Sequence, residues 1–104
     1  MERRLAPRAL LNKPLWLNKH LDGYPHLAEL VDLSEDGMLI RTIREPSNRE
    51  STFALELGIP GNPQRLWLWT ECVRRAGALQ ALRVRYADLF EKALLRQLVR
   101  WSMS

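Results

Sequence analysis

The sequence contains a single cysteine, Cys72, in 104 residues. One cysteine excludes an internal disulfide and a zinc site built from several thiolates. No apolar run approaches the ~20 residues that a membrane-spanning helix needs, and the charged N-terminus lacks the apolar segment of a secretory signal. These absences predict a cytoplasmic protein. The hydrophobic content of 46% and the charged content of 27% are typical of one globular domain.

Groups that commonly perform catalysis are also scarce. His20 and His26 are the two histidines, and no set of metal ligands accompanies them. Cys72 lies in an apolar run, where packing explains it better than nucleophilic chemistry does. The chain has no phosphate-binding P-loop and no GxSxG motif. We therefore expect neither an enzyme nor a metal site.

Lysine is scarce, whereas arginine is abundant: the chain has 3 lysines and 13 arginines, with a formal net charge of +4. The guanidinium group is planar, binds anions in a bidentate manner and stacks on aromatic rings. The bias therefore suits an anionic, aromatic partner. For any one arginine outside the first eight residues, solvation of a strand face is an equally good explanation.

Short strand-like runs separated by turn residues dominate the chain. They cover residues 10–17, 27–32, 38–43, 53–59, 66–73 and 82–86. Pro14 interrupts the first run, which favours an edge strand or a bulge. Gly77 centres a turn before the last run. Six such runs predict a mainly β fold, a small six-stranded antiparallel β-barrel, within a domain of residues 9–104.

Alternation within the later runs predicts which side chains face the barrel interior. Leu66 and Leu68 should face away from Trp67 and Trp69, and the side chains of Leu82, Val84 and Tyr86 should face away from those of Arg83 and Arg85. Tryptophans 16, 67, 69 and 101 offer stacking surfaces for nucleobases. We expect most of them instead to fill the barrel or its junction with a helix.

A change of period predicts a C-terminal helix over about residues 88–101. Asp88 is a suitable N-cap. Phe90, Leu94, Leu98 and Trp101 form an apolar stripe, widened by Leu89, Leu95 and Val99. A helix of about fifteen residues is marginal alone in water, so it must dock on the barrel or on a partner. Lys92, Arg96 and Arg100 line another face.

Two short motifs carry the clearest chemical signal. Arg4 and Arg8 form an RxxxR spacing within residues 1–8, a cationic arm that we expect to be flexible until a ligand orders it. Roughly one or two such spacings arise by chance in so arginine-rich a chain. Residues 32–37 form a DxSxxG spacing, for which on the order of 0.01 chance occurrences are expected. Gly37 would permit a positive φ or a close approach of ligand to the backbone.

In this order, the two motifs resemble those of the PilZ domain, a bacterial receptor for the second messenger cyclic di-GMP, and the resemblance covers nearly the whole chain. It implies that Arg4 and Arg8 bind guanine edges and phosphates, that Asp32 and Ser34 bind the other guanine edge, and that Gly37 keeps the turn tight. Arg3 precedes the motif and is a further candidate for stacking on a base or contacting a phosphate. No other cofactor is implied.

Three functions remain open at this point. The first is a cyclic di-GMP receptor that changes conformation and regulates an effector protein. The second is a PilZ-like adaptor that binds a protein but no nucleotide. The third is a small barrel that binds single-stranded nucleic acid through basic and aromatic side chains. We expect the first, and therefore expect no DNA or RNA partner.

Overall fold

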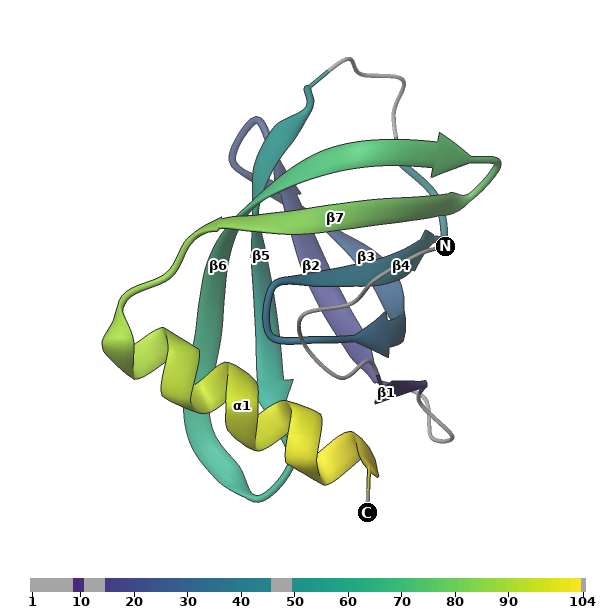
Figure 1. Ribbon diagram of the computed structural model, residues 1–104. Helices are drawn as coiled ribbons and strands as arrows, with labels where there is room; N and C mark the ends of the chain where they lie inside the picture. The colour runs from purple at the N-terminus through teal and green to yellow at the C-terminus, as the bar shows by residue number, and fades with distance from the viewer. Residues whose placement is uncertain (1–8, 11–14, 46–49, 104) are drawn as a thin grey trace.

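The computed structural model describes residues 9–10, 15–45 and 50–103, and it forms a barrel with one helix (Figure 1). The strands and the helix are β1 (Ala9–Leu10), β2 (Trp16–Leu21), β3 (Tyr24–Leu33), β4 (Gly37–Thr42), β5 (Thr52–Ile59), β6 (Asn62–Ala76), β7 (Leu79–Tyr86) and α1 (Leu89–Met103). The arm of residues 1–8, with Arg3, Arg4 and Arg8, lies outside the described residues.

Six strands close the barrel through antiparallel pairs. Their order is β3-β2-β5-β6-β7-β4, and a further pairing of β4 with β3 completes the ring. The predicted six-stranded antiparallel barrel is confirmed. The first predicted run, 10–17, has different bounds: β1 ends at Leu10, and β2 begins at Trp16. The two-residue β1 pairs Ala9 with Leu33 and Leu10 with Asp32, beside the DxSxxG segment.

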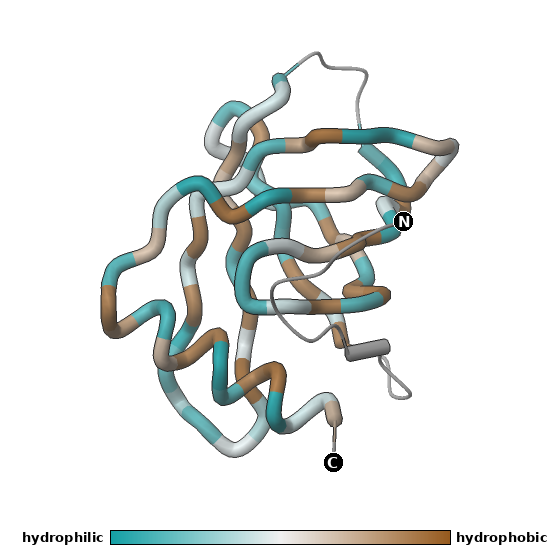
Figure 2. Tube along the Cα trace, in the orientation of Figure 1, coloured by the Kyte–Doolittle hydropathy of each residue, from teal (hydrophilic) through white to brown (hydrophobic). Residues whose placement is uncertain are grey.

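Apolar and polar residues alternate along the strands, as the hydropathy colours of Figure 2 show, and the buried apolar residues form the barrel core. In β5, Phe53, Leu55, Leu57 and Ile59 are buried, and the residues between them are partly exposed. In β6, Leu66 and Leu68 are buried, whereas Trp67 and Trp69 face outward. Each inward side chain removes apolar surface from water, at about 25 cal/mol per Å². The predicted facing of both strands is confirmed.

The C-terminal helix is confirmed, and it begins with a reciprocal cap. The backbone N–H of Glu91 donates to Asp88 Oδ1 at 2.8 Å, and the N–H of Asp88 donates to Glu91 Oε1 at 2.9 Å. α1 lies across one end of the barrel against β1, β5 and β6 (Figure 1). Its buried side chains are Leu94, Leu95, Leu98 and Val99.

The predicted apolar stripe of the helix is wrong at its first turn. Phe90 is 58% exposed and Leu89 is 82% exposed. The reason is that α1 meets the barrel only from Leu94 onward, so the first turn projects beyond the core. Trp101 packs partly buried against the core, as expected.

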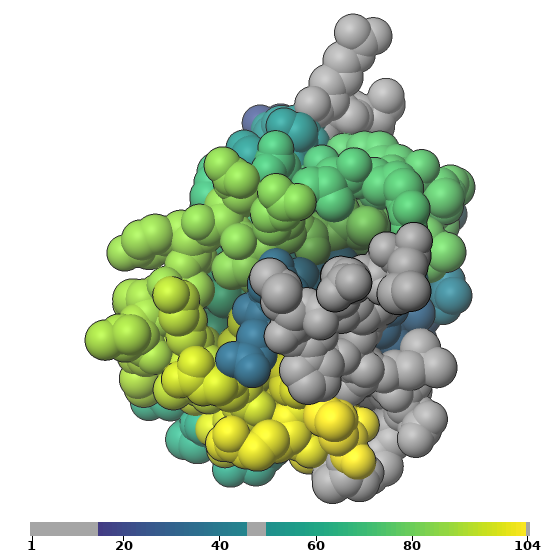
Figure 3. Space-filling view, viewed as in Figure 1, coloured from purple at the N-terminus to yellow at the C-terminus, as the bar shows by residue number. Residues whose placement is uncertain are grey.

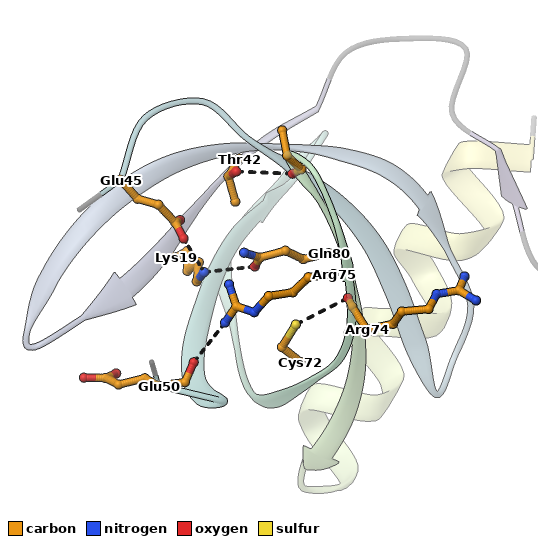
Figure 4. A network of polar contacts seen from close by, with 9 residues as sticks. Lys19, Thr42, Glu45, Glu50, Cys72, Arg74, Arg75 and Gln80 are labelled. Atoms are coloured by element: carbon orange, nitrogen blue, oxygen red, sulfur yellow. Dashed lines mark hydrogen bonds and ion pairs between the residues drawn. The ribbon is translucent and has the colours of Figure 1, made fainter. Parts of the chain in front are cut away.

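One cationic side chain lies inside the barrel. Lys19 is fully buried, and its Nζ donates to Glu45 Oε1 and Gln80 Oε1, both at 2.9 Å (Figure 4). The same Nζ lies 4.3 Å from the centre of the Phe53 ring. These partners compensate the loss of hydration that burial of an ammonium imposes. The segment after β4 is thereby attached to the barrel interior.

Candidate ligand-binding site

A bulge in β3 turns Asp32 to the outside of the barrel. The β3–β4 register pairs Leu30 with Ile40 but Asp32 with Leu39, so Val31 is the extra residue. Strict alternation from the buried Ala28 and Leu30 would have pointed Asp32 into the core. A bulge of this kind re-aims the following side chain. Because of it, the carboxylate lies on the outer wall.

A second bulge, in β6, does the same for an arginine. Cys72 pairs with Leu82 and Arg74 with Ala81, so Val73 is the extra residue. The thiol of Cys72 donates to the carbonyl oxygen of Arg74 at 3.5 Å across this irregularity (Figure 4). Arg74 therefore shares the outer face with Ala81, and the row continues across β4 to Asp32.

These outward side chains surround a hollow of about 580 Å³ on the wall formed by β3, β4, β6 and β7. Its lining is Asp32, Asp36, Gly37, Met38, Leu39, Val73, Arg74, Ala81, Leu82, Arg83 and Val84. We call it the wall pocket. Its volume is within the range of small-molecule sites, roughly 300–1,000 Å³. It combines carboxylates, guanidinium groups and an apolar floor.

Two arginines of the wall pocket have no ion pair with any of the described residues. Arg74 and Arg83 come from adjacent strands, and both side chains are exposed. By contrast, Arg41 donates to Glu29 at 2.7 Å, and Arg65 donates to Glu56 at 3.1 Å. Guanidinium groups without a carboxylate partner are available to phosphate or to a guanine edge.

The turn between β3 and β4 is held by Ser34. This residue is 2% exposed, and its Oγ lies 2.7 Å from Asp36 Oδ1 and 3.2 Å from the carbonyl oxygen of Gly37. Its backbone N–H donates to the same carbonyl oxygen at 2.9 Å. In this conformation the hydroxyl orders the turn and presents Asp36 at the rim of the wall pocket.

Gly37 is required by the neighbouring strand and not by a positive φ. The described glycines with positive φ are Gly23, Gly61 and Gly77, so the first of the two alternatives offered for Gly37, a positive φ, does not apply. A Cβ on Gly37 would lie 2.7 Å from the backbone oxygen of Leu82. A close approach to Gly37 is thus made by the backbone of β7, whereas the sequence had suggested an approach by the ligand.

No protein-family model matches the sequence, and no curated protein matches it. Solved structures do. The PilZ domain of YcgR from Escherichia coli, solved with c-di-GMP, has a TM-score of 0.77 and 17% identity over 97% of this chain and 92% of that chain. The PilZ domain of CeSA from a cellulose-synthesizing bacterium has a TM-score of 0.68 and 15% identity over 91% and 96%. The chain has a PilZ-like fold.

A third solved structure, an uncharacterised protein of Legionella, has a TM-score of 0.62 and 18% identity over 91% of both chains. Within the PilZ-like barrel, Asp32 and Gly37 of the predicted site line the wall pocket, and Ser34 lies beneath its rim. Arg3, Arg4 and Arg8 lie outside the described residues, so their roles stay predictions.

Arg74 and Arg83, which line the wall pocket, were not singled out by the sequence analysis. Alternation did place Arg83 opposite the buried Leu82, but nothing local distinguishes it from the other outward arginines. Arg74 has no such signal, because a bulge sets its direction and the bulge depends on the register between β6 and β7. Only the closed barrel brings these two guanidinium groups opposite Asp32.

The expected packing of the tryptophans is wrong for three of the four. Trp16, Trp67 and Trp69 are between 45% and 49% exposed on the outer wall of the PilZ-like barrel. The interior is already filled by leucines and Phe53, so no volume remains for indole rings. The ring centres of Trp67 and His20 lie 4.9 Å apart.

Tyr86 also faces outward, contrary to prediction. The β6–β7 register pairs Thr70 with Val84 but Trp69 with Tyr86, so Arg85 is an extra residue that reverses the facing of Tyr86. Its side chain is 67% exposed. The bulge places Tyr86 beside Trp69 near the start of α1.

Beside these aromatic side chains, Glu56 is the centre of a polar cluster. Its carboxylate accepts from His20 at 3.1 Å and from Arg65 at 3.1 Å. The hydrogen bond with His20 is the largest cause that lowers the pKa of Glu56 below 4.5, and Arg65 adds to it.

Among residues 9–10, 15–45 and 50–103, no cluster of potential metal ligands is found. In that same part of the chain, no helix has the length and apolarity to cross a membrane.

Proposed function

We propose that the protein is a cyclic di-GMP receptor and that the wall pocket is its binding site. The observation that carries the proposal is the position of the rarer motif. Asp32, Asp36 and Gly37 line a hollow that also contains Arg74 and Arg83, two guanidinium groups without ion pairs in the described structure. Acidic and cationic groups thus meet on one apolar floor.

The chemistry of cyclic di-GMP suits this arrangement. Each guanine has O6 and N7 acceptors on one edge, which a guanidinium group can bind in a bidentate manner. The N1–H and N2–H donors on its other edge suit a carboxylate, and Asp32 is the group we assign to them. Arg74 and Arg83 would bind the phosphates or a guanine acceptor edge. Val73 and Leu39 would cover the face of a base.

The path of the chain supports a contribution from the N-terminal arm. β1 starts at Ala9, the residue that follows Arg8, and it pairs with Leu33 and Asp32 of β3. The arm is therefore joined to the barrel directly beside the pocket acid. By the resemblance of the RxxxR motif, Arg4 and Arg8 would bind guanine edges and phosphates, with Arg3 as a further contact.

The energetic balance makes affinity sensitive to single arginines. A charge-assisted hydrogen bond contributes roughly 1.5–3 kcal/mol net. Ordering the arm opposes binding by roughly 1–2 kcal/mol for each backbone residue that becomes fixed. Loss of one bidentate contact then removes a large share of the net free energy. The receptor would act on a cytoplasmic effector protein, and we propose no catalytic step.

Calorimetric titration with cyclic di-GMP tests the proposal. We expect specific binding to the wild-type protein, no comparable binding of GMP, and an affinity at least about tenfold lower for Arg8→Ala with the fold unchanged. A protein that is folded by circular dichroism but does not bind cyclic di-GMP would refute a receptor role. Binding of an oligonucleotide that weakens steeply with salt would instead favour the single-stranded nucleic-acid reading.

A further inference from the structure

A second hollow lies between the barrel wall and the helix. Its volume is about 630 Å³, and it is lined by Glu35, Asp36, Val84, Arg85, Tyr86, Ala87, Lys92 and Arg96. Figure 3 shows the surface indented between the green β7 and the yellow α1. We call it the helix-side groove. It shares Asp36 and Val84 with the wall pocket, so the two hollows adjoin.

Cations outnumber acids in the lining of the helix-side groove by three to two. Arg85, Lys92 and Arg96 line it, and Arg100 continues the exposed stripe one helical turn further along α1. The acids Glu35 and Asp36 stand at the end of the groove near the β3–β4 turn.

The two ion pairs that the groove arginines make have long distances between nitrogen and oxygen. Arg96 lies 3.6 Å from Glu35, and Arg85 lies 3.5 Å from Glu71, with both arginine side chains about half exposed. Exposed pairs of this kind contribute roughly 0–1 kcal/mol. Carboxylates of another molecule could therefore replace them with little loss.

The position of Lys92 is not explained by the stability of α1. Lys92 is the first helix residue whose N–H donates within the helix, to the carbonyl oxygen of Asp88 at 2.9 Å. It therefore stands near the positive end of the helix dipole, where a cation is unfavourable. Its side chain is exposed and has no ion pair with the described residues. This placement points to an external anion.

An aromatic hollow adjoins the groove through Tyr86. It has a volume of about 210 Å³ and is lined by Ala54, Trp67, Leu68, Trp69, Tyr86 and Glu91. Trp67 and Trp69 are each nearly half exposed. Exposed tryptophan and tyrosine beside a small hollow are the side chains that most often provide binding energy at protein interfaces. The carboxylate of Glu91 in this lining accepts from the N–H of Asp88 in the helix cap, and the nearby Glu56 is paired with His20 and Arg65.

We propose that the helix-side groove and the aromatic hollow together dock an acidic segment of a partner protein that carries an apolar anchor residue. Charge complementarity decides the class of partner: carboxylates pair with Arg85, Lys92 and Arg96. The anchor enters the hollow between Trp69 and Tyr86, which lies beside the cations. The proposal goes beyond nucleotide binding and holds whether or not the wall pocket binds cyclic di-GMP.

Fluorescence anisotropy tests the docking surface with a labelled peptide in which glutamate alternates with leucine. The reference is the same peptide with glutamine in place of glutamate. We expect the acidic peptide to bind more tightly. Lys92→Glu should weaken it roughly tenfold at an ionic strength near 0.15 M, because a direct attraction becomes a repulsion while distant charges are screened. This variant places an anion near the helix N-terminus, which favours the helix. Loss of binding with an unchanged circular dichroism spectrum therefore comes from the surface and not from unfolding.

Matched variants separate the surface from general effects of charge and aromaticity. Arg44→Glu makes the same charge change at an exposed arginine that lines neither hollow, and it should change the affinity less than about twofold at an ionic strength near 0.15 M. Trp69→Ala should weaken binding by about fivefold or more, whereas Trp16→Ala, at an equally exposed tryptophan outside the hollow, should not.

Equal effects of Lys92→Glu and Arg44→Glu would overturn the proposal, and so would equal effects of the two tryptophan variants. Binding of anionic lipid vesicles and of an oligonucleotide should be measured for the same variants. The proposal would also be overturned if Lys92→Glu weakened either of these and left peptide binding unchanged. In each case cyclic di-GMP titration of the same variants is a separate measurement. Loss of nucleotide binding with peptide binding retained would refute only the receptor function.

Discussion

Adding one methyl group at Gly37 should disrupt the barrel beside the wall pocket. The Cβ of Gly37→Ala would lie 2.7 Å from the backbone oxygen of Leu82, and this oxygen belongs to a paired strand that cannot rotate away. The β4–β7 pairing must open by several tenths of an ångström. Forced expansion of a packed site costs typically 1–3 kcal/mol. For a domain of this length, about 2 kcal/mol corresponds to a fall in Tm of roughly 8–16 °C.

Gly58→Ala is the matched control. Its Cβ would also meet an atom at short distance, 2.6 Å, but that atom is Nη1 of Arg65, the end of a half-exposed and flexible side chain. The guanidinium group can move. Alanine also loses less conformational entropy on folding than glycine does, which stabilises the folded state by about 0.4–1 kcal/mol. We expect Gly58→Ala to change stability by less than about 1 kcal/mol. Calorimetric melting decides the comparison: equal Tm values for the two variants would refute the reasoning.

Three further predictions concern charges. Glu45→Ala should lower the free energy of unfolding by about 3 kcal/mol, because it leaves the Lys19 ammonium buried without its carboxylate. Urea unfolding of the double variant Glu45→Ala with Lys19→Met should show most of this stability recovered. No recovery would argue against the buried charge as the cause. The pKa of Glu56 is lowered below 4.5, mainly by a histidine hydrogen bond, so its ionised form stabilises the fold above pH 4.5 and that contribution disappears as pH falls through the lower folded-state pKa. Glu56→Gln should therefore be less stable than wild type at neutral pH, and the two free energies of unfolding should converge in acid. A stability difference that does not change with pH would refute the stabilising role of the ionised Glu56. Arg83→Ala should weaken cyclic di-GMP binding roughly tenfold in calorimetric titration, whereas Arg41→Ala, at an ion-paired arginine outside the wall pocket, should leave it unchanged.

Local signals predicted the main elements because they depend on few neighbours. Alternation in residues 53–59 needs only one buried face, and the observed β5 has the same apolar residues inside. The cap at Asp88 uses atoms three residues apart, so the start of α1 follows from the sequence. Gly77 adopts φ 61 in the turn where it was expected.

The error at Tyr86 arises because the register between two paired strands changes the facing of a side chain. The extra residue at Arg85 turned Tyr86 outward, contrary to the alternation expected over residues 82–86. The extra residue at Val31 places Asp32 on the outer wall, although strict alternation along β3 would have buried it. A bulge arises from the mismatch between two strands and leaves no clear mark in either strand alone. The exposed tryptophans have a related cause, because the interior volume of a closed barrel is limited.

The sequence alone determined the strand and helix pattern, the turn residues and the two motifs that resemble a nucleotide receptor, because each of these depends on chemistry within a few positions. Tertiary structure decided what surrounds Asp32. Asp32 lies more than forty positions from Arg74 and Arg83 in the sequence, so the strands had to close into a ring before these residues could line one hollow. Register, bulges and interior volume are properties of the closed ring, so no local pattern could specify them.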